Sequence, residues 1–143
     1  MTTGRSSGSI YTPEILSLAV ELAKYPLSEA LPLRGSARSK TCGSTLEIRV
    51  SCDESGGIAA IGMKVTACAI GQASAAIFAR HAVGTGLDSV LASSLALEKW
   101  LSSESDLPDW PDLSLIARAR DYPARHGAIL LPWKAAEQAL SIA

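Results

Sequence analysis

Apolar and polar residues alternate strictly along residues 44–52. Leu46, Ile48, Val50 and Cys52 fall on one side of an extended chain, and charged or hydroxyl-bearing side chains fall on the other. A period of two residues is typical of a strand with one face in the core and one face in water. The pattern therefore predicts a half-buried β-strand over this stretch.

Two neighbouring segments extend this strand into a sheet. Turn-forming residues occupy positions 53–57, and an apolar, partly β-branched stretch follows over 58–66. This order predicts a tight turn and an antiparallel return strand. Residues 36–41 predict a further strand before the alternating one, so we expect a small antiparallel sheet of three strands.

Helical spacing of apolar residues surrounds the predicted sheet. Thr12-Pro13-Glu14 offers a capping hydroxyl, a proline for the first helical position and an acid near the positive end of the helix dipole, so a helix is predicted over 13–25. Further helices are predicted over residues 69–83, 86–103, 113–120 and 128–142. The fold class is therefore α+β, a three-stranded antiparallel sheet with helices packed on one side of it.

Length and composition limit the organisation. The chain has 143 residues, 48% of them apolar, which suits one domain over residues 10–143 after a flexible tail over residues 1–9. The net charge of −1 gives no electrostatic case for nucleic acid or an anionic membrane. No apolar run is long enough to span a bilayer, and the N-terminus lacks the apolar core of a signal peptide. We expect a cytoplasmic protein.

Two of the three cysteines lie at junctions between predicted elements. Cys42 precedes Gly43, which can relax the backbone so that the thiol faces a shared pocket, and Cys68 directly precedes a predicted helix. Exposed amides and the helix dipole stabilise a thiolate at such a position, which makes it a better nucleophile and metal ligand. The predicted hairpin between the two cysteines can bring them together, so they are candidates for metal, sulfur or redox chemistry; small buried or turn cysteines are the alternative.

The remaining candidates are weaker. Cys52 continues the apolar face of the alternating strand and is expected in the core, and His81 is expected on a solvated helix face. His126 precedes the last helix beside Gly127, where an imidazole can ligate a metal, although lone histidines are more often structural. A thiol-dependent hydrolase or isomerase would need His126 to contact a cysteine as a base.

The order of these pieces resembles the iron–sulfur cluster assembly scaffolds, the IscU/SufU/NifU N-terminal family. The similar segments are Ile10-Tyr11-Thr12-Pro13-Glu14-Ile15, Thr41-Cys42-Gly43-Ser44, Ala67-Cys68-Ala69-Ile70-Gly71-Gln72-Ala73-Ser74-Ala75 and Arg125-His126-Gly127-Ala128-Ile129-Leu130. The resemblance starts near residue 10 and covers nearly all of the chain. It implies the SufE/NifU-like fold, and the stretch from Gly86 to Tyr122 resembles the longer SufU-like form. The chaperone-binding Leu-Pro-Pro-Val-Lys motif of the IscU form is absent.

The resemblance also implies a function. Proteins of this family hold iron, zinc or a [2Fe–2S] cluster on cysteines, receive sulfide from a cysteine desulfurase, and pass the cluster to carriers or apo iron–sulfur acceptor proteins. Carried over by position, Cys42, Cys68 and His126 would be the ligands. Two positions depart from the pattern, since Gly127 stands where the third cysteine belongs and Ser44 where an aspartate belongs. Three ligands leave one tetrahedral position open.

Three readings of the function remain. The first is a scaffold-like carrier, not an enzyme, that binds metal or a cluster through Cys42, Cys68 and His126. The second is a sulfur-relay protein, in which one cysteine accepts a persulfide from a desulfurase and needs no metal. The third is a degenerate scaffold kept as an interaction module. Metal content and the effect of cysteine substitutions separate the three.

Overall fold

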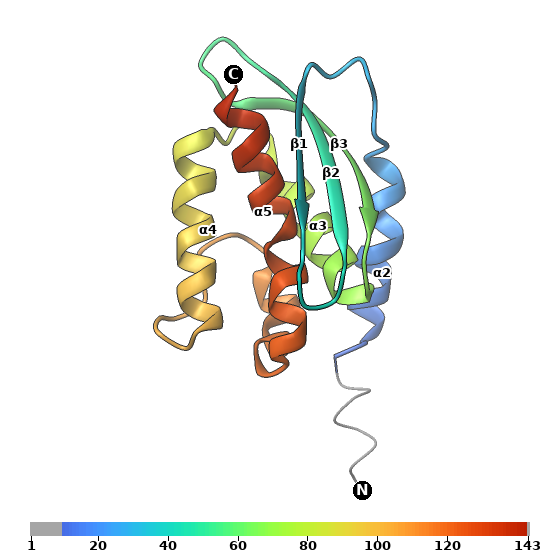
Figure 1. The fold of residues 1–143 in the computed structure, drawn as a ribbon, viewed down its shortest axis with the longest axis vertical. Helices are drawn as coiled ribbons and strands as arrows, with labels where there is room; N and C mark the ends of the chain where they lie inside the picture. The colour runs from blue at the N-terminus through green and yellow to red at the C-terminus, as the bar shows by residue number, and fades with distance from the viewer. Residues whose placement is uncertain (1–9, 143) are drawn as a thin grey trace, which may run out of the picture.

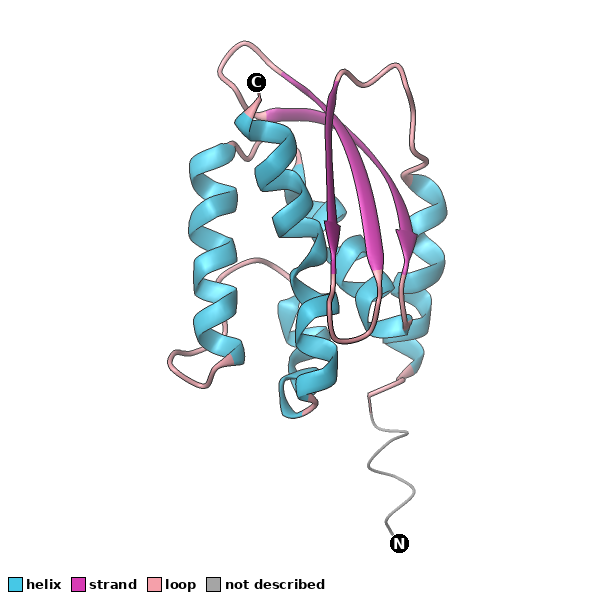
Figure 2. Ribbon diagram, in the orientation of Figure 1, coloured by secondary structure: helices cyan, strands magenta, loops and turns pink. Residues whose placement is uncertain are grey.

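The computed structural model describes residues 10–142, so the tail expected over residues 1–9 lies outside the described residues. Three strands form one antiparallel sheet in the order β1-β2-β3 (Figures 1 and 2). In chain order the elements are α2 Pro13–Glu21, η1 Leu22–Lys24, β1 Leu33–Arg38, β2 Thr45–Cys52, β3 Ile58–Thr66, α3 Ala69–Ala82, α4 Leu87–Leu101, η2 Leu113–Asp121, η3 Pro123–Arg125 and α5 His126–Ser141. The predicted α+β class is confirmed.

Strand β2 is the centre of the sheet and shows the predicted alternation. Leu46, Ile48 and Val50 are buried, whereas the residues between them are half-buried on the opposite face. Each strand pairs with its neighbour in antiparallel register, and the ladder between β2 and β3 is interrupted by a bulge at Ser51 and Cys52. One face of the sheet therefore belongs to the core and the other is open to solvent.

Strand β1 begins and ends three residues earlier than predicted. The sequence suggested residues 36–41, but the strand spans Leu33–Arg38 and includes Gly35. Helix α5 crosses this strand so closely that a Cβ on Gly35 would overlap the carbonyl oxygen of Ala135 and lie 2.8 Å from the nitrogen of Ala139. The glycine is required by this packing contact and not by a turn. The sequence alone does not show that contact, so the glycine resembles part of a linker there.

The helices cover the apolar face of the sheet (Figure 1). Helix α5 contacts β1 and β2, helix α3 contacts β3, and α2 and α4 pack on α3 and α5 respectively. The outer edge of β1 is less available for pairing with another strand at its centre, because the amide of Ser36 already donates to Oε1 of Gln138 at 2.7 Å. Within the described chain no helix is both long and apolar enough to span a membrane.

The core is centred on helix α3 and an aromatic cluster. Phe78 and Trp110 stack with ring centroids 5.1 Å apart, and Trp133 meets both rings edge-on at 5.2 Å. The indole nitrogen of Trp110 donates to the carbonyl oxygen of Ile77 at 3.2 Å, so this ring is buried with its polar atom satisfied. The cluster anchors the connection between α4 and η2 to the rest of the domain.

A network of charged side chains on the protein surface also fixes the connection between α4 and η2. The Arg80 guanidinium donates twice to Glu21 at 2.7 Å and once to Asp112 at 3.2 Å, and Nε2 of His81 lies 2.7 Å from the same Asp112 carboxylate. Helix α2, helix α3 and the start of η2 are joined by these contacts. His81 therefore contacts an acidic partner, whereas the sequence predicted only a solvated residue on the helix surface.

Three helices differ from their predicted form, and the first of them, predicted over 13–25, is α-helical only to Glu21 and ends in the 3-10 turn η1. The segment expected as a helix over 113–120 is the 3-10 helix η2, and it is interrupted at Ile116, whose φ of −113° and ψ of 15° are not helical. Helix α5 begins at His126, two residues before the predicted start. The last helix therefore includes both His126 and Gly127 in its first turn.

Candidate functional site

Three segments that carry the predicted site residues meet at one end of the sheet. The β1–β2 loop carries Cys42, the junction between β3 and α3 carries Cys68, and the start of α5 carries His126. In Figure 1 the β1–β2 loop, the end of β3 and the beginning of α5 lie at the same end of the molecule. The hydroxyl of Thr41 also donates to the carbonyl oxygen of Ala124 at 3.5 Å, which ties the loop to the approach of α5.

The Cys42 loop is a tight turn closed by backbone hydrogen bonds. The amide of Ser39 donates to the carbonyl oxygen of Ser44 at 2.8 Å, and the amide of Gly43 donates to the carbonyl oxygen of Ser39 at 2.9 Å. Gly43 has a φ of +71°, a left-handed conformation that favours glycine. The backbone freedom expected of Gly43 is therefore used in this turn, and the pocket shared by the two thiols stays a prediction.

The thiol of Cys42 is exposed and lies between two serine hydroxyls. Its Sγ atom is 3.3 Å from Oγ of Ser39 and 3.1 Å from Oγ of Ser44. The hydrogen bonds to Ser39 and Ser44 lower the pKa of the Cys42 thiol, and the nearby Arg125 guanidinium lowers it further. The loop therefore presents a thiol that ionises more readily than an ordinary cysteine and is open to solvent.

Cys68 occupies the N-cap position of helix α3, as predicted. Its backbone is extended, with φ −66° and ψ 171°, and its carbonyl oxygen accepts from the amide of Gln72 at 2.9 Å. The Gln72 side chain also donates to the carbonyl oxygen of Ala67 at 2.9 Å, which fixes the junction between strand and helix. The half-buried Cys68 side chain makes no capping hydrogen bond, so its thiol is not engaged with the helix end.

Arg125 is a site residue that the sequence does not single out. Its Nη2 atom donates to the hydroxyl of Tyr11 at 3.1 Å. That hydrogen bond raises the pKa of Arg125, and the negative charges of ionised Cys68 and Cys42 raise it as well. One guanidinium therefore lies in the electrostatic field of both cysteines. Its position beside His126 in the third motif is the signal that could have indicated it.

His126 opens helix α5 and is anchored to the backbone. Its Nε2 atom lies 2.6 Å from the carbonyl oxygen of Arg120. A carbonyl oxygen only accepts, so Nε2 carries the proton and Nδ1 is the atom of a neutral imidazole that can donate to a metal. Hydrogen bonding of one ring nitrogen to a backbone carbonyl is common in metal-ligating histidines. The same Nδ1 atom is the nitrogen that a base of the Cys–His type would use.

Gly127, which stands in place of the third cysteine, faces the Cys42 loop. A Cβ added at Gly127 would overlap Oγ of Ser39 and would lie 3.1 Å from Cβ of Ser39 and 3.6 Å from the hydroxyl of Thr41. Ser39 is buried, and the same hydroxyl reaches the Cys42 sulfur. The space beside Cys42 that a side chain at position 127 would need is therefore taken by Ser39, a residue with no distinguishing signal in the sequence.

The donors at this end of the molecule do not form a ligand cage. Among residues 10–142 no three histidine, cysteine or acidic side chains gather into a metal-binding group. Ser44, in place of the aspartate, gives a hydroxyl to Cys42 and no carboxylate. Cys52 packs half-buried against the core on another part of the sheet, as expected. The ligand set Cys42, Cys68 and His126 stays a prediction.

Solved structures of two other proteins share this architecture. One, described as the N-terminal part of a nitrogen-fixing NifU-like protein from Brucella abortus, is 29% identical and covers 95% of each chain with a TM-score of 0.84. The other, described as an iron–sulfur cluster assembly scaffold protein of the SUF system from Fervidobacterium islandicum, is 23% identical. It covers 94% of this chain and 98% of its own, with a TM-score of 0.80. No family model and no curated protein matches the sequence.

The fold is an α+β domain of the type found in NifU-like and SufU scaffold proteins, and the resemblance predicted from the sequence is confirmed. Of these two structures, the NifU-like N-terminal domain overlaps this chain more closely. At 23% identity the SUF-system protein shows the fold alone. The coverage means that this domain type accounts for almost the whole sequence.

Proposed function

We propose that this chain takes part in iron–sulfur cluster assembly as a scaffold-like carrier. Its cargo would be iron, zinc or a [2Fe–2S] cluster, held for transfer to acceptor proteins. The observation that carries the proposal is that the segments bearing Cys42, Cys68 and His126 meet at one end of a NifU-like fold. Hydrogen bonds with Ser39 and Ser44 and the charge of Arg125 lower the pKa of Cys42, which favours the ionised thiol that binds metal and sulfur.

The donor set suits such cargo in its chemistry. Two thiolates and the Nδ1 atom of His126 are ligands that zinc and iron–sulfur clusters accept. The hydrogen bond between His126 and Arg120 would orient the ring and hold the proton on Nε2. Three donors leave a fourth position for water, a small thiol or a partner's side chain, so the cargo would be held loosely and released easily.

Partners and location follow from the same proposal. A cysteine desulfurase would supply sulfur in the cytoplasm, and apo iron–sulfur proteins or carriers would receive the product. The proposed role is that of a carrier and not of an enzyme. A chain that releases its cargo needs an exposed ligand, and Cys42 is the exposed cysteine of the three.

A second candidate function is sulfur relay, and the surroundings of Cys42 favour it. The hydroxyls of Ser39 and Ser44 contact this sulfur, and neutral groups there repel a second anionic sulfur less than the family's carboxylate would. In this step the Cys42 thiolate attacks the terminal sulfur of a desulfurase persulfide. A new sulfur–sulfur bond forms on Cys42, the old one breaks, and the desulfurase cysteine leaves as a thiolate, so no external oxidant or reductant is needed.

Anaerobic purification followed by metal and sulfide analysis tests the carrier proposal. Wild type would be measured beside Cys42→Ser and Cys68→Ser, with Cys52→Ser as the matched control on a cysteine outside the site. We expect about one metal per chain in wild type and in Cys52→Ser, and loss of the metal in the other two variants. Iron together with sulfide would indicate a cluster, whereas zinc alone would indicate a resting or regulatory form.

Absence of metal in wild type would contradict the carrier proposal and leave two alternatives. Incubation with a cysteine desulfurase and ³⁵S-labelled cysteine separates them. Label on Cys42 that is lost in Cys42→Ser would support sulfur relay. A chain that takes up neither metal nor label would be a degenerate scaffold fold kept as an interaction module.

A further inference from the structure

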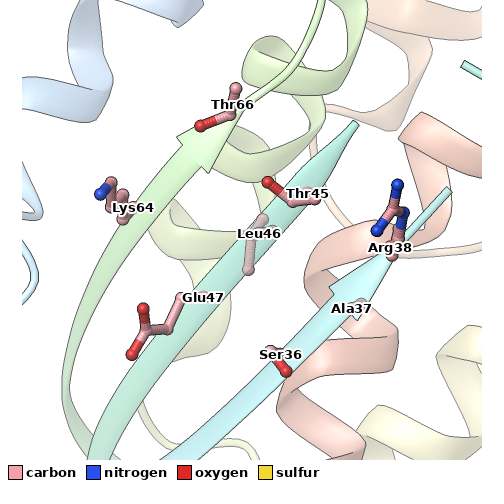
Figure 3. A pocket seen from close by; sticks show the side chains of 8 residues that line it. All are labelled: Ser36, Ala37, Arg38, Thr45, Leu46, Glu47, Lys64 and Thr66. Atoms are coloured by element: carbon pink, nitrogen blue, oxygen red, sulfur yellow. The ribbon is translucent and has the colours of Figure 1, made fainter. Parts of the chain in front are cut away.

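The open face of the sheet is strongly basic, although the chain as a whole is slightly acidic. The register places three rows of side chains on this face: Arg38 with Thr45 and Thr66, Ser36 with Glu47 and Lys64, and Arg34 with Arg49. We call these eight residues the outer sheet face. Six of them stand on the side of the sheet away from the helices in Figure 3, around an open hollow of about 530 Å³.

The charge imbalance of this face is large for its size. It carries four of the chain's 13 basic residues and one of its 14 acidic residues, which gives a net charge of +3. The whole chain has a net charge of −1, so the remainder carries −4. The excess negative charge lies in the loops, chiefly at Asp53 and Glu54 after β2 and at Glu104, Asp106, Asp109 and Asp112 between α4 and η2, whereas the helices are nearly balanced in charge.

In the described part of the chain, most of these cations form no ion pair with a carboxylate. Glu47 lies 3.5 Å from Arg34, and Arg49 donates to the carbonyl oxygen of Leu31 at 3.1 Å. Among the described residues, Arg38 and Lys64 make no salt bridge, and both are exposed. Unpaired cations on a rigid sheet are available to a partner without the cost of breaking an internal ion pair.

The face also ends at the candidate site. Arg38 is followed directly by the loop that carries Cys42, and Thr66 lies two residues before Cys68. Lys40, exposed in the same loop, continues the positive charge toward Cys42. A molecule bound on the sheet would therefore have its edge beside both thiols.

We propose that the outer sheet face is a docking surface for a partner protein that presents a cluster of carboxylates. Arg38, Lys64 and Arg34 would meet the carboxylates, and the hydroxyls of Ser36, Thr45 and Thr66 would donate further hydrogen bonds. Complementary charge of this kind speeds association and fixes orientation more than it adds affinity. Only the idea that this partner exchanges cargo with Cys42 and Cys68 rests on the proposed function; the docking itself does not.

A carboxylate surface fits this face better than a nucleic acid does. Glu47 lies in the central row between Ser36 and Lys64, where it would repel a continuous phosphate backbone. A protein surface can place one cation opposite Glu47 and carboxylates opposite the surrounding arginines and lysine. The pattern of one anion among cations is therefore a recognition pattern for a protein.

An amide-resolved NMR titration tests the proposal, with a 20-residue polyglutamate peptide as the probe for a carboxylate surface. A polyglutamine peptide and a 20-nucleotide single strand of DNA are the comparators. We expect shift changes confined to residues 34–38, 45–49 and 64–66 with polyglutamate at low salt, none with polyglutamine, and weaker binding of DNA. Shift changes spread over the helices, or tighter binding of DNA, would overturn the proposal.

Charge variants locate the binding. Arg38→Glu with Lys64→Glu should weaken polyglutamate binding by about tenfold or more, whereas Lys24→Glu with Lys99→Glu, the same change of charge on exposed helical positions, should change it by less than about twofold. Equal losses in both double variants would overturn the proposal. Arg38→Gln with Lys64→Gln provides a milder change if the reversed pair fails to fold.

One more variant separates docking from cargo handling. Cys42→Ser with Cys68→Ser removes both thiols and leaves the outer sheet face intact. We expect this variant to bind polyglutamate as wild type does even if metal analysis contradicts the carrier proposal. Loss of polyglutamate binding in this variant would mean that the cysteines and not the basic face recognise the peptide, and would overturn the docking proposal alone.

Discussion

Ser39 occupies the space that a side chain at position 127 would need. A Cβ on Gly127 would overlap the Ser39 hydroxyl and would lie 3.1 Å from Cβ of Ser39, while the same hydroxyl lies 3.3 Å from the Cys42 sulfur. The buried serine and the glycine are therefore sterically coupled beside the candidate site. Replacing the glycine alone cannot rebuild a third ligand next to Cys42 without moving Ser39.

A double-mutant cycle tests this coupling. Gly127→Ala should destabilise the domain by about 1–3 kcal/mol, because the added methyl group overpacks the contact with Ser39. Ser39→Gly in the same chain should recover most of that loss, so the two effects should not add. Chemical denaturation of the two single variants and the double variant measures the interaction energy, and simple additivity would show that Ser39 does not fill this space.

The contact between Ser39 and position 127 also determines whether a cysteine placed at position 127 can bind metal. Gly127→Cys alone should gain little affinity for Co²⁺, whereas Ser39→Gly with Gly127→Cys should bind it more tightly and show stronger sulfur-to-cobalt charge-transfer absorption. The reason is that removal of the serine side chain opens room for the new sulfur beside Cys42. Equal cobalt spectra for the single and double variants would contradict the steric role of Ser39.

The Cys42 thiol should be alkylated at lower pH than the Cys52 thiol. Hydrogen bonds with Ser39 and Ser44 lower the pKa of Cys42, whereas burial and the nearby Asp53 raise the pKa of Cys52. The thiolate is the reactive form, so its fraction at neutral pH is larger for Cys42. Iodoacetamide labelling across pH, read by peptide mass spectrometry, gives both profiles.

Substitution of the hydroxyl partner identifies the cause of that reactivity. Ser39→Ala should raise the pKa of Cys42 and slow its alkylation at pH 7 by about 3- to 10-fold, since one pKa unit is a tenfold change in thiolate. Ser141→Ala, which removes an exposed hydroxyl on α5, is the control. An unchanged profile in Ser39→Ala would assign the reactivity to Ser44 or Arg125.

The Arg80 network should make stability depend on acid pH. Hydrogen bonds from Arg80 lower the pKa of Glu21, and those from His81 and Arg80 lower the pKa of Asp112. Carboxyl groups with a lowered pKa stabilise the folded state above their unfolded pKa, near 4, and lose that contribution as pH falls through the folded pKa. The network should therefore stabilise at neutral pH and not in strong acid.

Arg80→Gln isolates this contribution. We expect it to cost about 1 kcal/mol at pH 7 after solvent screening of these partly exposed groups is allowed for. The difference from wild type should shrink toward zero between about pH 4 and pH 2. Denaturation curves across this range provide the measurement. A constant difference at every pH would show that Arg80 acts through packing and not through charge.

Gly35 should tolerate no side chain. Gly35→Ala places a methyl group against the α5 backbone at Ala135 and Ala139, so we expect a loss of about 2–3 kcal/mol or more as the helix is forced from the sheet. Gly86→Ala is the control, because its added methyl group would meet only one backbone oxygen at 3.4 Å. Thermal unfolding of both variants compares them directly, and similar melting temperatures would contradict the close packing of α5 on β1.

The sequence predicts most of this fold because its strongest signals are local. The alternation through Leu46, Ile48 and Val50 shows which face of β2 is buried, and the residues Thr12 and Pro13 mark the start of α2, where the Thr12 hydroxyl accepts from the amide of Ile15 at 3.2 Å. The predicted position of strand β1 differs from the observed one by three residues. The one buried residue of this strand, Gly35, packs against helix α5, which lies 100 residues away in the chain, so no local pattern marks it as part of a strand.

The candidate site was predictable only in part for the same reason. Cys42 and Cys68 are recognisable because each stands at a local junction between elements. Ser39 and Arg125 gain their roles from contacts made across the fold, Ser39 with position 127 and Arg125 with Tyr11 and the field of both cysteines. No local pattern in the sequence predicts those contacts, although the position of Arg125 beside His126 in the third motif indicates that it lies near the site.

X-ray absorption at the zinc edge of the zinc-loaded chain counts the sulfur neighbours of the ion and so tests whether Cys42, Cys68 and His126 bind it together. We expect two sulfur ligands and one imidazole ligand per zinc, falling to one sulfur in Cys42→Ser and in Cys68→Ser and staying at two in Cys52→Ser. A zinc ion with no sulfur ligands, or one whose sulfur count is unchanged by the Cys42 and Cys68 substitutions, would contradict this ligand set.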